Sequence, residues 1–280
     1  MKKSSQEQQY VMSCLNTPMM NYAVYVPKKS EKIVVNMILF LAGGVIGLLF
    51  YGGLFRVDGE STAATYVADL VAILIIGCAV MRLLMPVYVN HALEKRSRAL
   101  KNQFRAMLSS LSASMSAGSN VQKAFEDALT DLLIQYKEDD YIVKEMREIL
   151  NGMAQNVNAE VLIRDFGNRS GNEDIVFFAD VFEICYRKGG DLKAVIQKTY
   201  HSISEKLEIE DEIETKLVSN KMQHNVMSIM PIIVVAMLKF TNDTFAENFA
   251  TPVGVLVNTV AIGIFIASYR FGLKICDVKV

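Results

Sequence analysis

The hydrophobic residues of this chain gather in four long runs, two near each end, while the middle mixes apolar and polar positions with a helical period. The uncharged run 33–55 is long enough, at about 1.5 Å per residue, to cross the roughly 30 Å hydrocarbon layer of a membrane. Run 66–89 is of similar length and carries Asp69 and Arg82 toward its ends. Run 253–269 is uncharged, whereas run 225–238 is shorter and can cross the membrane only if flanking residues are included. The pattern predicts four transmembrane helices.

The positions of the cations orient these four helices. Lysines precede the first run, a basic group from Lys95 to Arg105 follows the second, and cations follow the fourth. The positive-inside rule therefore predicts that both termini and the segment 90–224 are cytoplasmic, in an inner or plasma membrane. Asp58-Gly59 predicts an external turn between the first two spans. A cleaved signal peptide is the competing interpretation of the first run, but the run is too long and starts about 30 residues into the chain.

The pattern divides the chain into five parts. We expect a cytoplasmic segment at 1–32, transmembrane helices 1 and 2 at 33–89, a cytoplasmic helical bundle at 90–224, transmembrane helices 3 and 4 at 225–271, and a cytoplasmic tail at 272–280. The first 30 residues carry no motif, and the stretch from Met12 to Tyr22 is expected to be either amphipathic or disordered.

The middle segment predicts an all-α fold. Val121, Phe125, Ala128 and Leu132 follow the i, i+4, i+7 spacing of a buried helix face, and comparable stripes recur along 100–217. Turn and capping residues separate the stripes: we expect structural turns at Gly118, Gly171, Gly189 and Gly190, and helix starts at Ser119 (with Gln122 as a capping box), Asn172 and Asp191. The last helix, from Asp191, can continue unbroken into the third apolar run.

Charge and composition exclude several classes of function. Residues 90–224 hold 18 of the 29 Lys and Arg and 22 of the 30 Asp and Glu, but the net charge of −1 offers no electrostatic case for binding nucleic acid. The four cysteines and three histidines are scattered, so we expect neither a disulfide framework nor a metal site. No phosphate-binding loop, dinucleotide fingerprint, nucleophile elbow or zinc-protease motif occurs. We therefore predict no catalytic, cofactor-binding or metal-binding residue.

Two groups of acidic residues on the last bundle helix are candidate contact residues. Glu205, Glu208 and Glu212 lie on its polar side, and we expect them to be solvated. Glu210 and Glu214 fall within the apolar arc, one turn apart. Either the helix has left the bundle there and both are in water, or they form a buried carboxylate pair that holds a cation or an Arg of another helix or subunit.

Two further stretches have alternative interpretations. The small-residue run 109–118 is either a close helix crossing inside the bundle or a contact between protomers. The basic cluster Lys95–Arg105 is interpreted as an anchor on an anionic lipid surface, or as a surface for an acidic partner.

Three stretches resemble a known family: Phe104–Leu129, Phe177–Leu217 and Ser228–Leu238. They are similar to the type II secretion system F domain, and more narrowly to the single-domain inner-membrane platform proteins of tight-adherence (Tad/Flp, type IVc) pili. The turns at Gly118 and at Gly189-Gly190 are the most specific matches. The resemblance covers about half of the chain, and the order of two spans, one helical domain and two spans also agrees with it.

The resemblance implies a platform with no enzymatic activity and no cofactor, at the base of a pilus or secretion machine. Its implied partners are a hexameric cytoplasmic ATPase, pilin subunits and the lipid bilayer. Larger relatives carry the domain twice, whereas no internal repeat is visible here, so the second copy would come from a homo-oligomer or a paralogous platform protein. From exposure and charge alone, the candidate contacts are Glu205, Glu208 and Glu212, and the loop tip from Lys137 to Asp140.

Two alternatives come from other classes of function. A membrane signal transducer with a helical relay domain would need a sensor, but the external loops are too short for a folded domain. A small-molecule transporter usually carries ionisable groups at mid-span, and these runs hold few.

Overall fold

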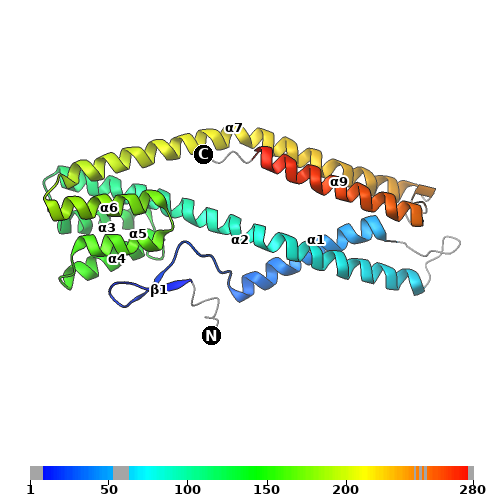
Figure 1. The fold of residues 1–280 in the computed structure, drawn as a ribbon, viewed down its shortest axis with the longest axis horizontal. Helices are drawn as coiled ribbons and strands as arrows, with labels where there is room; N and C mark the ends of the chain where they lie inside the picture. The colour runs from blue at the N-terminus through cyan, green and yellow to red at the C-terminus, as the bar shows by residue number, and fades with distance from the viewer. Residues whose placement is uncertain (1–8, 53–62, 243, 246–247, 249–250, 277–280) are drawn as a thin grey trace. The chain divides into compact units, whose positions relative to one another are not determined.

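A computed structural model describes residues 9–52, 63–242, 244–245, 248 and 251–276. In these ranges the chain is helical apart from one short ribbon, which confirms the all-α prediction (Figure 1). The ribbon is formed by β1 (Tyr10–Met12) and β2 (Pro18–Met20). The helices are α1 (Lys29–Tyr51), α2 (Ala63–Ser116), α3 (Val121–Gln135), α4 (Tyr141–Ala154), α5 (Ala159–Ser170), α6 (Glu173–Lys188), α7 (Leu192–Thr241) and α9 (Pro252–Cys276).

The chain forms two compact units. One combines the segment up to Val26 with Tyr88–Ile209, and we call it the helical unit. The other, the apolar unit, combines Pro27–Val87 with the chain from Glu210 onward. The N-terminal segment therefore belongs with the bundle, and the helical unit ends at Ile209, before the boundary expected at residue 224.

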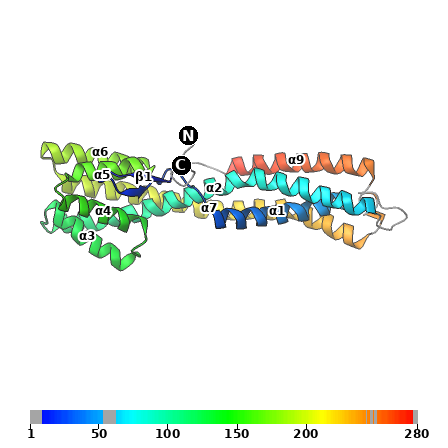
Figure 2. The same cartoon turned by 90° about the horizontal axis from the view of Figure 1, so that it is seen from below.

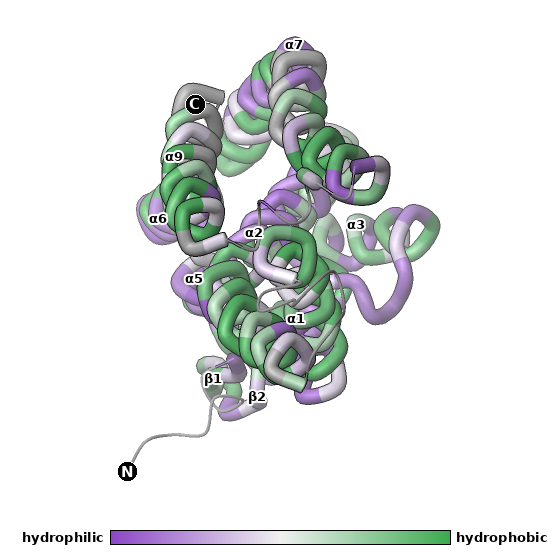
Figure 3. The backbone as a smooth tube through the Cα atoms, turned by 90° about the vertical axis from the view of Figure 1, so that its right-hand side faces the viewer, coloured by the Kyte–Doolittle hydropathy of each residue, from purple (hydrophilic) through white to green (hydrophobic). Residues whose placement is uncertain are grey.

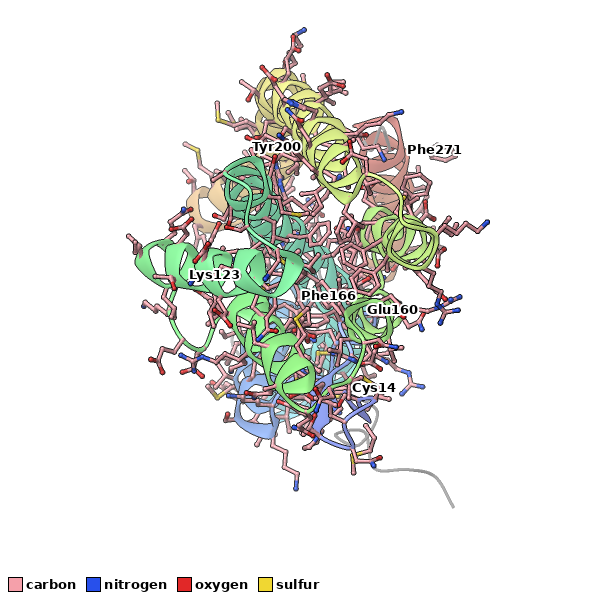
Figure 4. All side chains as sticks on the ribbon, turned by 90° about the vertical axis from the view of Figure 1, so that its left-hand side faces the viewer. Cys14, Lys123, Glu160, Phe166, Tyr200 and Phe271 are labelled. Atoms are coloured by element: carbon pink, nitrogen blue, oxygen red, sulfur yellow. The ribbon has the colours of Figure 1, made fainter. Side chains whose placement is uncertain are left out.

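Buried apolar side chains fill the helical unit. Within it, α3 packs on α4, α4 on α5 and α5 on α6, and the four helices lie beside one another (Figures 1 and 2). Phe104 of α2, Phe166 of α5 and Phe178 of α6 meet in the interior, with ring centroids 6.1 Å and 5.4 Å from Phe104. Figure 4 shows Phe166 among the helices and Lys123 on the outside. On the stripe predicted for α3, Phe125, Ala128 and Leu132 are buried and Val121 is half-buried.

The helix ends follow from capping chemistry. Gly118, Gly171 and Gly189 have φ of 93°, 63° and 72°, a region that glycine enters without steric cost, and so confirm the predicted turns. Gly190 follows directly in the same turn and its N–H donates to the Cys185 carbonyl. The Asn172 side chain accepts from the N–H groups of Asp174 and Ile175 at the start of α6.

The first turns of α3 and α7 give one correction and one confirmation. The side chain of Asn120, rather than that of Ser119, caps α3 by accepting from the Lys123 N–H at 2.9 Å, so the capping box predicted at Ser119 is wrong by one residue. Asp191 accepts from the Ala194 N–H and opens α7 as predicted. Propensity alone does not choose between neighbouring Ser and Asn, because both are good caps.

The N-terminal segment is the main feature that the sequence pattern missed. From Gln9 onward it is neither an amphipathic helix nor unstructured. β1 and β2 pair antiparallel, with Tyr10 opposite Met20 and Met12 opposite Pro18, and Tyr22 behind them is 2% exposed. Short pairings that depend on distant contacts carry no periodic signal in the sequence.

In the apolar unit, α1 and α2 cross closely. Gly43 lies so near α2 that a Cβ there would be 2.9 Å from the Gly77 Cα and from the Val80 Cβ, and a Cβ on Gly47 would be 3.2 Å from the Ala72 carbonyl oxygen. Gly43 and Gly47 form the small-xxx-small spacing that lets two helices approach within a membrane. Outward-facing side chains such as Ile38, Leu41 and Val45 are exposed and apolar. Figure 3 shows this concentration of hydrophobic residues along α1.

Two helices of the described chain are long and apolar enough to cross a membrane: Lys29–Tyr51 and Thr65–Ser116. The third and fourth predicted spans also lie in helices, within α7 and α9, but their apolar stretches, Ile229–Thr241 and Val253–Ile264, are shorter. The turn predicted at Asp58-Gly59 and the tail from 277 onward lie outside the described residues.

Candidate functional site

The acidic side of α7 is exposed. Glu205, Glu208 and Glu212 all face solvent, whereas Ile203 and Leu207 on the opposite side are 1% exposed. Glu212, in the apolar unit, accepts a hydrogen bond from Lys216 at 2.7 Å, which lowers the pKa of its carboxyl. Within the described part of the chain, Glu205 and Glu208 have no such partner, so both are available to an outside cation.

The loop tip before α4 holds most of its charges within itself. The Lys137 N–H donates to Asp140 Oδ2 at 2.9 Å and closes the turn. Lys144 pairs with Asp139 at 2.9 Å and lowers its pKa, and Arg147 pairs with Glu138 at 3.2 Å. Lys137 and Asp140 therefore belong to one hydrogen-bonded turn. Ile134, close before this turn in the chain, has an apolar side chain that is 81% exposed.

Glu210 and Glu214, the two carboxylates of the apolar arc, are only partly described. Glu210 is only half-buried, and the side chain of Glu214 lies outside those described. Among the side chains that the structure describes, the completely buried carboxylate is Glu145 of α4, which is 0% exposed and meets Arg169 of α5. An arginine of another helix does hold a buried carboxylate, therefore, but at a different position in the bundle.

The buried ion pair between Arg169 and Glu145 is bidentate. Arg169 Nη1 donates to Glu145 Oε1 and Nη2 to Oε2, both at 2.8 Å, and Nε donates to Asp165 Oδ2 at 2.9 Å. Burial raises the pKa of Glu145, while the Arg169 guanidinium and the Tyr22 hydroxyl oppose that rise. Burial lowers the pKa of Arg169, but the bonds and charges of Glu145 and Asp165 outweigh it and the net pKa is raised.

The sequence did contain a signal for this pair. Glu145 falls between Ile142, Met146 and Ile149 on the apolar stripe of α4, at i+3 from the first. Arg169 continues the stripe of Leu162 and Phe166 on α5. A charged residue in register with a buried stripe, on each of two neighbouring helices, predicts a pair because an isolated buried charge is costly.

Two members of the basic cluster after the second apolar run are buried in the bundle. Arg96 is 7% exposed, donates to the Val24 carbonyl at 3.1 Å, and lies 4.6 Å from the centroid of the Tyr25 ring. Lys101 is 8% exposed and lies 3.5 Å from Asp174. These two cations hold the bundle together, whereas Lys95 in the same cluster is exposed.

The small-residue run makes an intradomain contact at one position. The Ser114 hydroxyl donates to Asp127 Oδ2 at 2.7 Å, joining the end of α2 to α3, and this bond lowers the pKa of Asp127. This contact favours the helix-crossing interpretation of the run over the protomer contact.

A groove of about 700 Å³ runs between α6 and the first part of α7. Its walls combine apolar side chains, of which Phe177 is 65% exposed, with Lys198, Lys206 and Asp174. Lys206 pairs with Asp174 across the groove. The groove is therefore lined by both apolar and charged side chains.

Among the described residues, no cluster of three or more His, Cys, Asp or Glu side chains is arranged to hold a metal ion. Comparisons of the chain with models of known protein families, with curated proteins and with solved structures give no match.

Proposed function

We propose that this chain is an inner-membrane platform subunit of a pilus-like or type II-like secretion machine, coupling a hexameric cytoplasmic ATPase to pilin assembly or protein export. One observation carries the proposal: α2 and α7 each join an apolar stretch to the charged bundle as a single helix, of 54 and 50 residues. A helix transmits force along its axis, whereas a flexible linker absorbs it.

The membrane part of the proposal is supported by exposed apolar surface. The most apolar windows of α1 and α2 are only 17% and 6% buried, so these helices are unlike the core helices of a soluble protein. Lipid is the solvent that such surface requires. We propose that α1, the first part of α2, the end of α7 and α9 are four spans, with both termini and the bundle in the cytoplasm, as the cations indicate.

The ATPase contact is proposed on α7 rather than at the loop tip. Glu205 and Glu208 are exposed and have no ion-pair partner among the described residues, whereas the acidic residues of the tip already meet Lys144 and Arg147. Exposed charges without internal partners are the ones that steer and orient a basic partner surface. In this proposal the chain has no catalytic residue and binds no cofactor, and it works with a second copy or a paralogous platform protein.

The contact is tested by binding of the full chain, in detergent or nanodiscs, to the purified ATPase. We expect the double charge reversal Glu205→Lys/Glu208→Lys to weaken binding at least about tenfold, with a smaller dependence on salt. The matched control is Glu138→Lys/Asp139→Lys at the loop tip, which changes charge by the same amount. If the wild-type chain and the α7 variant bind equally, the ATPase does not bind at Glu205 and Glu208. If only the tip variant loses binding, the ATPase binds at the loop tip instead.

The topology is tested separately with a reagent that does not cross membranes. We expect single cysteines introduced at Asn151 and at Glu208, in an otherwise cysteine-free chain, to be labelled only when the cytoplasmic side is open. A cysteine introduced at Asp58 should be labelled from the outside. Labelling of the Asn151 position in intact cells would contradict the platform proposal.

A further inference from the structure

The residues from Gln9 to Val26, which we call the N-terminal strap, cross the surface of α4 and α5. Tyr22 is the deepest of them: it is 2% exposed, and its ring packs edge-on against Tyr141 with 5.5 Å between centroids. Its hydroxyl donates to Glu145 Oε1 at 2.8 Å. A phenol that reaches a buried carboxylate combines an apolar body with one polar tip, as in many peptide-recognition pockets.

Arg169 forms hydrogen bonds with the strap backbone at Tyr22 and at Met20, two residues before it. The Tyr22 N–H donates to the Arg169 carbonyl at 2.8 Å, and Arg169 Nη1 donates to the Met20 carbonyl at 3.3 Å. At the end of α5, Gly171 leaves room for the next strap residue, because a Cβ there would be 2.8 Å from the Cα of Ala23. Tyr22 and Ala23 form a turn at this point, and the end of α5 leaves room only for a backbone that follows that turn.

Three further polar contacts hold the strap, two near its start and one near its end. The Ser13 hydroxyl donates to Glu148 Oε1 at 2.8 Å, and the Thr17 hydroxyl donates to the same oxygen. At the other end, Arg96 of α2 binds the Val24 carbonyl. Tyr22 is thus the most deeply buried apolar side chain of the strap, and Leu15 and Met20 pack partly buried against the same core.

The surface under the strap is complete without it. The two bonds between Glu145 and Arg169, and the bond between Arg169 and Asp165, involve α4 and α5 alone. When Tyr22 leaves, the buried carboxylate keeps its counter-charge and gains access to water. The strap in turn keeps its own pairing, because β1 bonds only to β2 in the described sheet.

From this arrangement we propose that α4 and α5 form a preformed binding site for a tyrosine-bearing peptide that turns at the tyrosine, and that the strap is its resident, releasable ligand. The strap leaves as one piece while the helices remain folded. With the strap docked, only residues 25–28 lie between Val24, whose carbonyl Arg96 binds, and the start of α1 at Lys29. Release therefore lengthens the tether between the bundle and the first apolar helix.

The first test is residue-resolved hydrogen exchange on the full chain in nanodiscs. The Tyr22 amide reports docking, the Ser13 amide reports the ribbon because it donates to the Thr17 carbonyl, and the amides of α4 and α5 report the bundle. We expect the Tyr22 amide to exchange well before those of α4 and α5. Exchange of all three groups at one common rate would show that the strap opens only with global unfolding, and would overturn the proposal.

A matched pair of glycine variants isolates the strap contact. Gly171 and Gly189 both end helices with left-handed φ, of 63° and 72°, so alanine at either position carries similar backbone strain. Only at Gly171 would the new Cβ meet the strap, since nothing lies within 4 Å of a Cβ on Gly189. We expect Gly171→Ala to speed exchange of the Tyr22 amide roughly tenfold or more, and Gly189→Ala to leave it unchanged. Equal effects of the two variants would contradict the proposal.

A second variant keeps the test valid if Gly171→Ala disturbs α5 itself. Tyr22→Phe removes only the hydroxyl that bonds Glu145, and we expect the backbone amide at this position to exchange roughly ten- to a hundredfold faster, with α4 and α5 unchanged. A fluorescein-labelled peptide of residues 9–26 is then added to full-length Tyr22→Ala. We expect it to bind there more tightly than to the wild-type chain, whose site is occupied, and binding to neither chain would overturn the proposed site.

Discussion

The carboxylate of Glu145 and the guanidinium of Arg169 face each other inside the helical unit with both N–O distances at 2.8 Å. Glu145 is 0% exposed in its side chain and Arg169 is 6% exposed, so water screens neither charge. The pair joins α4 to α5, two helices separated by a short connection, and it supplies the surface on which the strap lies. The strength of this ion pair therefore affects both the stability of the bundle and the docking of the strap.

Removing the cation of this pair should be costly. We expect Arg169→Met to lower the free energy of unfolding of the bundle by about 3–5 kcal/mol, because it leaves a buried carboxylate without its counter-charge. Thermal denaturation followed by circular dichroism measures the difference. Arg164→Met is the control, since the side chain of Arg164 is 53% exposed and its pairs should contribute less than about 1 kcal/mol. The double variant Glu145→Met/Arg169→Met should recover much of the loss, and a double variant as unstable as the single one would contradict this account.

The same variant should respond to pH in a defined direction. Burial already raises the pKa of Glu145, and Arg169 opposes that rise, so Arg169→Met should raise it further. A carboxyl whose pKa is higher in the folded state than in the unfolded state binds its proton more tightly when folded. Its destabilising effect therefore grows as pH rises above the unfolded value of about 4.3 and shrinks on acidification. We expect the deficit of Arg169→Met to be smaller near pH 5 than near pH 8, and a deficit that is independent of pH would contradict it.

Asp127 gives a pH effect of the opposite sign. The Ser114 hydroxyl and Lys123 lower its pKa, so its contribution is complete above the ordinary aspartate value and is lost as pH falls through the lowered folded value. We expect Ser114→Ala to destabilise the connection of α2 to α3 at neutral pH, and the difference from wild type to vanish well below about pH 4. Melting temperatures measured across that range, with the exposed Ser109→Ala as control, test the sign. A difference that persists undiminished in acid would show that the Ser114 effect does not depend on the Asp127 charge.

Packing of the apolar unit is tested by a pair of glycines with different surroundings. Gly43→Ala places a Cβ 2.9 Å from the Gly77 Cα, so α1 and α2 must separate, at a cost of about 1–3 kcal/mol. A Cβ on Gly263 of α9 would meet nothing within 4 Å, and Gly263→Ala should be neutral or slightly stabilising. Detergent-induced unfolding in mixed micelles gives both values. Equal sensitivity at the two positions would mean that the α1–α2 crossing does not stabilise the unit.

The local chemistry of helix ends was predictable from the sequence because it depends on neighbours in the chain. Gly171 followed by Asn172, and Gly189 followed by Gly190 and Asp191, predicted turns and helix starts that the structure confirms. The one-residue error at Ser119 arose where two capping residues are adjacent. The periodic stripes likewise predicted which faces of the helices are buried.

The contacts that depend on distant residues were not predictable in the same way. Tyr22 looks like any tyrosine in a polar N-terminal stretch, and only its approach to Glu145, 123 positions further on, makes it a core residue. Arg96 and Lys101 carry the charge pattern of a membrane-surface cluster, yet burial against Val24 and Asp174 gives them another role. Periodicity reports which face of a helix is buried, but not which element buries it.

The last prediction compares two asparagines that precede helices. Asn172 accepts from two backbone N–H groups at the start of α6, whereas Asn158, at the start of α5, makes no side-chain capping bond. Asn172→Ala should therefore destabilise the bundle by about 1 kcal/mol, and Asn158→Ala by clearly less, in the same thermal denaturation assay. Both substitutions remove the same amide, so the difference isolates the capping bonds. Similar losses at the two positions would show that asparagine acts there through its backbone conformation, and that the cap geometry of α6 adds no stability of its own.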